Sequence, residues 1–157
     1  MKLIELRNGM KTQVDDDDFE SLSLFRWSYK HGYAIRTSGR KAIYMHNEIL
    51  KPPPGLFCDH INRDKLDNCR SNLRVCERYQ NAGNAEKYNF GRVPTSQYKG
   101  VHFERQSKRW VAEIYKKNVR HRLGRFRSED DAARAYNLAA AEYWADFAYL
   151  NSVPDKD

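Results

Sequence analysis

The amino-acid sequence predicts an α+β fold built from small antiparallel sheets and a few helices. Short alternating or β-branched segments, separated by turn residues, fill residues 1–45 and return after residue 97. Between them, residues 56–84 follow the order strand, loop, strand, helix, and residues 132–150 carry apolar side chains at helical spacing. We therefore expect a β-rich beginning, a compact ββα unit, and a final three-stranded antiparallel sheet with one helix.

The N-terminal elements are predicted from their turns. Arg7-Asn8-Gly9 and Ser38-Gly39 are hairpin-type turn signals between strand-like segments. The acidic run Asp15–Asp18 is expected to be a solvated turn that caps a short helix. The predicted strands are KLIELRNG, KTQV, WSYKHGYAIRT and KAIYMH, and the predicted helix is FESLSLF.

The ββα unit begins after a run of prolines. Pro52–Pro54 ends the preceding element, because successive prolines remove backbone donors and prevent a helix from continuing. The following strand should deliver Asp59 and His60, and the helix of the unit should carry Asn81. The expected elements are a strand at 56–58, a polar loop at 61–71, a returning strand at 72–75 and a helix from about Glu77.

The C-terminal part is predicted to be a sheet with one helix. Three strand-like segments, YKGVHFE, RWVAEIYKK and RHRLGRF, are separated by polar turns. Ser128 and the three acidic residues after it match a capping box, and the helix that follows has a small-residue face that can lie close to a sheet. The predicted domains are a first domain at 1–84 (lead-in 1–45, ββα core 46–84), a linker at 85–97 and a second domain at 98–152.

Positive charge is concentrated in one segment. The chain has a formal net charge of +7, and residues 98–127 contain ten Lys or Arg against two Glu, a local net charge of +8. Basic side chains interleaved with Tyr98, Trp110 and Tyr115 suit phosphate contacts, because each neutralised phosphate releases condensed counterions. An ordinary solvated basic face is the alternative. The segment lacks the amphipathic helical periodicity of membrane-surface binding, so we expect no membrane partner.

The three cysteines favour a reducing compartment. Cys58, Cys69 and Cys76 form no CxxC pair and leave an odd count, which suits free thiols better than a disulfide scaffold. With His60 they offer four zinc ligands, but their spacing does not match the knuckle pattern of two close pairs, which argues against zinc. An export signal and an apolar run of ~18 residues are both missing. We expect a cytoplasmic protein.

Residues 59–81, DHINRDKLDNCRSNLRVCERYQN, contain the parts of a site that hydrolyses phosphodiesters. Asp59 and the amide carbonyl of Asn81 are hard oxygen donors that suit one Mg²⁺ or Mn²⁺. His60 should point to the opposite strand face from Asp59 and act as general base, because an imidazole titrates near ~6.5. Asn72, twelve residues after His60, can hold a ring nitrogen or the loop backbone beside it. Taken singly, each of these residues is more often structural.

This stretch resembles a known family. YMHNEILKPPPGLFCDHINRDKLDNCRSNLRVCERYQN is similar to the HNH nuclease motif of phage and intron homing endonucleases. The resemblance implies a ββα-metal (His-Me finger) site in which Asp59 and Asn81 hold one divalent cation. It also implies that His60 activates water and that Asn72 orients His60. His46 matches a histidine that commonly precedes the motif and is a candidate accessory residue.

The basic segment resembles a second family. SQYKGVHFERQSKRWVAEIYKKNVRHRLGRFRSEDDAARAYNLAAAEYWADFAYLN is similar to the plant APETALA2-type (ethylene-response-factor) DNA-binding domain. That family lays a three-stranded sheet in the major groove of double-stranded DNA and braces it with one helix. The plant target sequence does not carry over, because several arginines of those domains are replaced here. The expected DNA contacts are Lys99, His102, Arg105, Lys108, Arg109, Trp110, Tyr115, Arg120 and Arg122.

The leading hypothesis is a homing-type DNA endonuclease. Its ββα unit would hydrolyse phosphodiester bonds at sites that the C-terminal sheet selects. The alternatives are a DNA-binding regulator with an inactive nuclease unit, and a zinc-stabilised packaging protein. One active site per chain fits nicking by a monomer, whereas double-strand cleavage requires a homodimer on DNA or sequential cuts.

Overall fold

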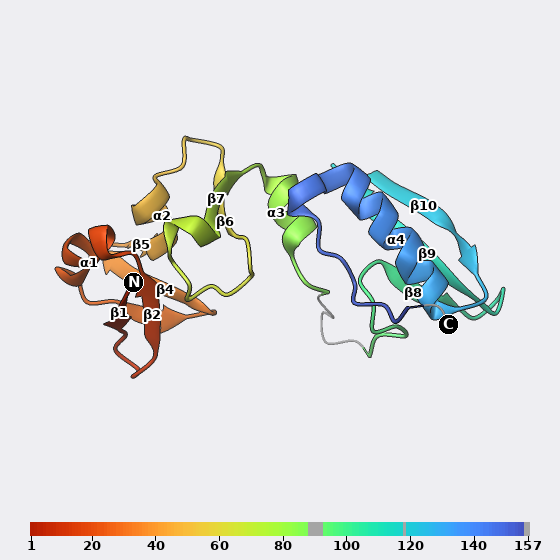
Figure 1. Ribbon diagram of the computed structural model, residues 1–157, viewed down its shortest axis with the longest axis horizontal. Helices are drawn as coiled ribbons and strands as arrows, with labels where there is room; N and C mark the ends of the chain where they lie inside the picture. Colours follow the sequence, from red (N-terminus) through yellow and green to blue (C-terminus); the bar gives the residue numbers. More distant parts are fainter. Residues whose placement is uncertain (88–92, 118, 156–157) are drawn as a thin grey trace. The chain divides into compact units, whose positions relative to one another are not determined.

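The structure is a computed structural model that describes residues 1–87, 93–117 and 119–155. Within these residues the chain folds into small antiparallel sheets and short to medium helices (Figure 1). This arrangement confirms the predicted α+β class. None of the described helices is both long and apolar enough to cross a membrane.

The chain divides into two compact units, unit 1 (Met1–Asn81) and unit 2 (Ala82–Asp157). The boundary falls inside helix α3 (Arg78–Asn84), three residues before the predicted end of the first domain. Part of the predicted linker is bound to unit 2, since Lys87 Nζ donates to the carbonyl of Tyr98 at 2.9 Å. Residues 88–92 of that linker lie outside the described residues.

Unit 1 is made of short strands and helices. They are β1 (Lys2–Glu5), β2 (Lys11–Val14), α1 (Asp16–Ser23), β3 (Ser28–Lys30), β4 (Tyr33–Ser38), β5 (Lys41–Tyr44), α2 (Met45–Leu50), β6 (Phe57–His60), a 3₁₀ turn (Arg70–Asn72) and β7 (Leu73–Cys76). β1 pairs with β2, β3 to β5 form a sheet in that order, and β6 pairs with β7, all antiparallel. The prediction of one strand over WSYKHGYAIRT is wrong. The chain turns at His31 and Gly32, whose φ angles of 52° and 92° suit a two-residue hairpin turn.

The acidic run connects α1 to the ββα unit. Asp15 is the residue before α1, but its side chain makes no cap hydrogen bond, so the predicted cap is wrong. Its Oδ2 instead accepts the backbone N–H of Arg70 at 2.7 Å. Asp18 accepts the Nε and Nη2 hydrogens of Arg70 at 2.8 and 2.7 Å. The helix is therefore bonded to the 3₁₀ turn that precedes β7.

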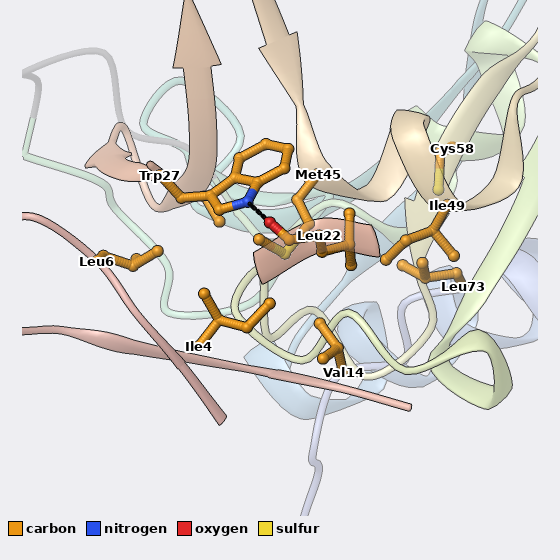
Figure 2. Close-up of a cluster of buried hydrophobic side chains, with 10 residues drawn as sticks. Ile4, Leu6, Val14, Leu22, Trp27, Met45, Ile49, Cys58 and Leu73 are labelled. Carbon is orange, nitrogen blue, oxygen red and sulfur yellow. Dashed lines mark hydrogen bonds between the residues drawn. The ribbon is translucent and has the colours of Figure 1, made fainter. Parts of the chain in front are cut away.

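The core of unit 1 also supports the strands of the ββα unit. Figure 2 shows Trp27, which is 1% exposed, with its Nε1 donating to the carbonyl of Leu22 at 2.8 Å. Cys58 of β6 and Leu73 of β7 belong to the same cluster, so these strands rest on the N-terminal elements. The buried members are Ile4, Leu6, Val14, Leu22, Trp27, Ala34, Met45, Ile49, Cys58 and Leu73.

Unit 2 is a three-stranded sheet covered on one face by a helix (Figure 1). Its elements are β8 (Val101–Glu104), β9 (Arg109–Lys116), β10 (Val119–Phe126), α4 (Glu129–Trp144) and a 3₁₀ turn (Ala145–Phe147), with antiparallel strand order β10-β9-β8. Ser128 caps α4 as predicted, its Oγ accepting the N–H groups of Asp130 and Asp131. Gly100 has a φ of 73°, and a Cβ there would lie 2.0 Å from the ring of Tyr136. Only glycine fits this contact.

Candidate functional site

The paired strands β6 and β7 carry Asp59 and His60. Asp59 lies opposite Arg74, and His60 lies opposite Leu73, in the antiparallel register. Asp59 and His60 are 6% and 5% exposed, so both polar side chains are buried. Because neighbouring side chains on a strand point to opposite faces, each meets a different set of partners.

Asp59 forms a buried ion pair. Arg74 donates from Nε and Nη2 to Oδ2 of Asp59 at 2.9 and 2.8 Å, and the two side chains are 15% and 6% exposed. A buried carboxylate needs such compensation, because its charge is costly to remove from water. Arg74 was not predicted from the sequence. Its position directly across from Asp59 becomes visible only when the strand register is known.

His60 is held by Asn68 and packs against His46. The Nε2 atom of His60 lies 3.2 Å from Oδ1 of Asn68. The rings of His60 and His46 meet edge to face, with centroids 5.0 Å apart. Burial lowers the pKa of His60, and the hydrogen bond with Asn68 opposes this shift. The net lowering favours the neutral imidazole, the form that can accept a proton.

The candidate accessory residue His46 is part of an aromatic wall beside His60. It begins the first turn of α2 after Met45 and is buried. Its ring lies 5.3 Å from that of Tyr33 and 5.4 Å from that of Tyr44, between centroids. Burial, followed by the charge of the nearby His60, lowers the pKa of His46 to about 4. His46 is therefore neutral at pH 7.

Asn72 braces the loop between β6 and β7. It lies in the 3₁₀ turn just before β7, not in the strand where it was expected. Its Oδ1 accepts the N–H of Asn62 at 2.9 Å, and its Nδ2 donates to the carbonyl of Asp67 at 2.8 Å. Of the two alternatives open from the sequence, a ring nitrogen or the loop backbone, these bonds correspond to the loop backbone.

Asn81 lies in α3, where its backbone N–H donates to the carbonyl of Glu77 at 3.1 Å. The backbone of Asn81 hydrogen-bonds the thiol of Cys76. Burial raises the pKa of that thiol to about 11, and the charge of Asp59 adds to the increase. The pKa of Cys76 is therefore influenced by the charge of Asp59 and by the backbone of Asn81. A carboxylate and an amide oxygen suit Mg²⁺, and the described residues contain no group of three His, Cys, Asp or Glu side chains that could hold a metal.

Asn68 and the strand that supports it, β2, were not predicted to belong to the site. Asn68 is 1% exposed, and its Nδ2 donates to Oγ1 of Thr12 in β2 at 2.8 Å. The backbones also pair, because Gln13 donates to Leu66 and accepts from Asn68, each at 2.8 Å. A parallel bridge between Gln13 and Asp67 results. One signal existed in the sequence: Thr12 is a polar residue on the face of KTQV that Val14 buries.

In unit 2, the sheet face away from α4 is basic. Directly opposed residues share a face, and the register pairs Tyr115 with Arg120 and Glu113 with Arg122. Ala112, on the other face, packs into the cluster formed with α4. The open face, as we name it, consists of His102 and Glu104 from β8, Arg109, Val111, Glu113 and Tyr115 from β9, and Arg120, Arg122 and Arg125 from β10.

A β-bulge brings Arg122 and Arg125 together. The register shifts between Arg122 and Gly124, so that Arg125 joins Arg122 on the open face although the two are three residues apart. Glu104 accepts Nη2 of Arg122 at 2.6 Å and Nε of Arg125 at 2.8 Å. Hydrogen bonds from Arg125, Ser107 and Arg122 lower the pKa of Glu104 to about 2. Arg125 was not among the predicted contacts.

Two of the predicted DNA contacts, Lys99 and Trp110, make contacts within unit 2. Lys99 Nζ donates to the carbonyls at the end of α3, including that of Gly83 at 2.8 Å and that of Ala85 at 2.6 Å. Its ammonium is therefore bonded within unit 2, where a cation suits a helix C-terminus. Trp110 faces α4, packing on the unit 2 core with its ring centroid 5.1 Å from that of Phe103.

The other predicted DNA contacts are accessible. Five of them lie on the open face, namely His102, Arg109, Tyr115, Arg120 and Arg122. Arg105 and Lys108 lie in the exposed turn between β8 and β9. The basic side chains of this group are thus presented at one side and one end of the sheet.

Known proteins give a partial match. The chain is 29% identical over 147 residues to a protein of Acanthamoeba polyphaga mimivirus named as an uncharacterised HNH endonuclease, covering 89% of this chain and 74% of that protein. It is 46% identical over 52 residues to an AP2/ERF and B3 domain-containing transcription factor of Arabidopsis thaliana. It is 43% identical over 61 residues to a putative AP2/ERF and B3 domain-containing protein of Oryza sativa subsp. japonica. No family model and no solved structure matches the chain.

These alignments differ in reach. The two plant alignments cover 33% and 39% of this chain and only 15% and 19% of the plant proteins. The chain is thus similar along most of its length to a protein with an HNH endonuclease name, and over about a third to proteins named for an AP2/ERF domain. Both family resemblances drawn from the motifs are therefore supported, at low sequence identity for the HNH protein and over a short alignment for the AP2/ERF proteins.

Proposed function

We propose that this protein is a metal-dependent DNA endonuclease in which unit 1 cuts and unit 2 binds the duplex. The observation that carries the proposal is His60, a buried imidazole kept neutral by its surroundings, oriented by Asn68 and adjacent in the chain to the buried carboxylate of Asp59. The similarity to a mimivirus protein named as an HNH endonuclease supports the same reaction class.

We further propose one divalent cation, Mg²⁺ or Mn²⁺, held by the carboxylate of Asp59 and the amide oxygen of Asn81. When bound, it supplies charge stabilisation at the phosphate oxygens. Two oxygen ligands from the protein, with water and phosphate completing the shell, are typical of Mg²⁺. Arg74 shares the Asp59 carboxylate, so a cation at this position either joins or displaces its guanidinium.

The side chains of unit 1 perform the proton transfer. His60 takes a proton from the attacking water, whose oxygen forms the new bond to phosphorus as the bond to the leaving oxygen breaks. Asn72 keeps the loop after His60 in place through its bonds to Asn62 and Asp67. His46 packs its ring edge to face against that of His60 and restricts its movement.

The open face of the unit 2 sheet is the proposed duplex-binding surface. It concentrates arginines on a ribbon narrow enough for the major groove, where arginine can bond guanine edges. The AP2/ERF names of the plant relatives support this choice. We propose homing-type cleavage, with nicking by a monomer or double-strand cutting by a homodimer.

Plasmid cleavage tests the proposal. Supercoiled plasmid incubated with the full-length protein and Mg²⁺ or Mn²⁺ should be nicked or linearised, and chelator should stop the reaction. His60→Ala should lower the rate by ~10²- to 10⁴-fold, because a positioned general base contributes that much. His31→Asn is the matched control, since His31 is exposed in a turn with a positive φ that asparagine tolerates.

A second candidate, a DNA-binding regulator with an inactive nuclease unit, is favoured by one observation. The Arg74 guanidinium already bonds the carboxylate proposed to hold the cation. If wild type and His60→Ala are equally inert with both cations on several DNAs while the protein still binds duplex, the regulator is correct and the endonuclease is rejected.

A further inference from the structure

We infer that Thr12 and Asn68 are positioning residues that hold His60 in a single tautomer, with the hydrogen on Nε2 and the lone pair on Nδ1. The inference rests on the proposed role of His60 as general base and adds two residues to it. Asn68 contacts the imidazole directly, and Thr12 acts through Asn68 from β2.

The hydroxyl of Thr12 determines the direction of the network. Its Oγ1 lies 2.7 Å from the carbonyl oxygen of Leu66, which is a hydrogen-bond length. A carbonyl cannot donate, so the single hydrogen of the hydroxyl must lie in this contact. Its other contact as a donor, 4.0 Å to Sδ of Met45, also directs the hydrogen away from Asn68. In its contact with Asn68, the hydroxyl oxygen of Thr12 can therefore only accept a hydrogen bond.

Asn68 must therefore present its Nδ2 to Thr12, where the distance is 2.8 Å. The amide oxygen then faces Nε2 of His60 at 3.2 Å. The oxygen and nitrogen of an amide are otherwise hard to assign, and here the hydroxyl decides between them. Because an amide oxygen only accepts, Nε2 must carry a hydrogen, and Nδ1 of the neutral ring holds the lone pair.

Burial and backbone pairing make the opposite arrangement unfavourable. Thr12 is 0% exposed and Asn68 is 1% exposed, so neither can exchange its partner for bulk water. A flipped amide would take the hydroxyl hydrogen and leave two acceptor oxygens 2.7 Å apart at Leu66. The bridge between Gln13 and Asp67 prevents the loop from moving away to relieve that contact.

The tautomer selects the reacting atom. With Nε2 protonated, Nδ1 is the atom of His60 that can accept the proton of water. Thr12 and Asn68 together thus set both the orientation of the His60 ring and which of its nitrogens is basic, a supporting role commonly taken by partners of catalytic histidines.

Nuclear magnetic resonance of the full-length wild-type protein tests the inference directly. With ¹⁵N-labelled histidine above the pKa of His60, Nε2 should show the chemical shift of a protonated nitrogen and Nδ1 that of a lone-pair nitrogen. The signals are assigned by their absence in His60→Ala. The reverse pattern, or averaged shifts from two tautomers, overturns the inference. An inert protein with the expected tautomer would reject the nuclease and leave the inference intact.

Variants of Thr12 test whether Thr12 positions His60 through Asn68. Thr12→Val keeps the shape but removes the acceptor, so the Asn68 amide can flip and a second tautomer should appear. If both tautomers are equally populated, half of the molecules lack a basic Nδ1, so kcat for plasmid nicking falls about two-fold while KM stays the same. Thr12→Ser should restore the single tautomer, and Thr37→Val, exposed on β4, is the matched control.

The outcomes separate a positioning role from a merely structural one. A folded Thr12→Val that keeps one tautomer and full kcat overturns the role of Thr12. If Thr12→Val does not fold, the wild-type and Thr12→Ser spectra still decide, because a single Nε2–H tautomer in both is required.

Discussion

The two units use polar side chains in opposite ways. In unit 1, Asp59, His60 and Asn68 are buried, and each is held by partners that water cannot replace. In unit 2, Arg122 and Arg125 are about half exposed and share one carboxylate. Buried polar groups are costly unless their partners are fixed, whereas exposed pairs can rearrange at little cost. A reaction needs fixed atoms, while binding along a duplex benefits from cations that can still adjust.

Removing one partner of an ion pair tests this contrast most strongly. Arg74→Ala should lower the free energy of unfolding by about 3 to 5 kcal/mol, because it leaves the Asp59 carboxylate buried without its guanidinium. Arg122→Ala should cost about 1 kcal/mol or less, since its pair with Glu104 is partly exposed. Urea unfolding at pH 7 measures both. Equal losses would remove the distinction between the units.

Arg74→Ala also tests whether Asp59 binds the proposed cation. If Asp59 binds Mg²⁺, then adding Mg²⁺ should stabilise Arg74→Ala more than wild type, because the cation replaces the missing positive charge. Asp59→Asn in the Arg74→Ala background is the control and should lose this response. A Mg²⁺ effect that is identical in all three proteins would contradict Asp59 as a ligand.

Acid should destabilise unit 1 through His46. Its pKa is lowered from 6.5 to about 4. Between these two pH values His46 is protonated in the unfolded chain but neutral in the folded protein. The free energy of unfolding is therefore unaffected by protonation of His46 above pH 6.5. It falls by on the order of 3 kcal/mol as the pH drops from 6.5 to 4. His46→Phe keeps a ring without a titrating group. Its unfolding free energy should depend less on pH over this window, and an unchanged dependence would contradict the assignment.

Lys99 and Arg120 separate folding from DNA binding within unit 2. Lys99→Ala should lower stability by about 2 kcal/mol, because three charged hydrogen bonds to the carbonyls at the end of α3 are lost, and leave the salt dependence of DNA binding unchanged. Arg120→Ala should leave stability nearly unchanged but lower the salt slope by about 0.9 if it contacts a phosphate. Thermal unfolding and binding titrations at several salt concentrations distinguish the two. The reverse result would return Lys99 to the DNA interface.

Glu104 should have the smallest effect on folding and a visible one on selectivity. Glu104→Gln removes the charge that anchors Arg122 and Arg125. Affinity for a random duplex should rise by roughly two- to ten-fold at low salt, since one repulsive charge is gone. Selection from a random duplex library should yield a weaker consensus. Glu142→Gln, exposed on α4, should change neither property.

The local parts of the site could be predicted from the sequence, and the long-range parts could not. The spacing of Asp59, His60 and Asn72 lies within one strand–loop–strand segment, where turn and strand patterns constrain the chain. Thr12 and Asn68 are 56 residues apart, and no local pattern indicates that their side chains meet. Pairing of Asp59 with Arg74 required the strand register.

The unit 2 sheet shows the same limit. Alternation along a strand places Arg122 and Arg125 on opposite faces, and only the bulge before Gly124 reverses this. Lys99 looked like a surface cation because its partners belong to the end of a helix that the sequence analysis assigned to the other domain. The chemistry of each side chain could be predicted from the sequence. Which side chains lie next to one another depends on the tertiary structure and could not.

The bridge between Gln13 and Asp67 has a consequence for protein engineering. The recognisable motif runs from Tyr44 to Asn81, and a designer would naturally transplant that stretch alone into a new scaffold. Such a graft would leave behind β2, whose backbone closes the loop and whose hydroxyl holds the Asn68 amide. A portable cassette has to include β2 and its partner β1, so the smallest transferable module for the proposed site is all of unit 1.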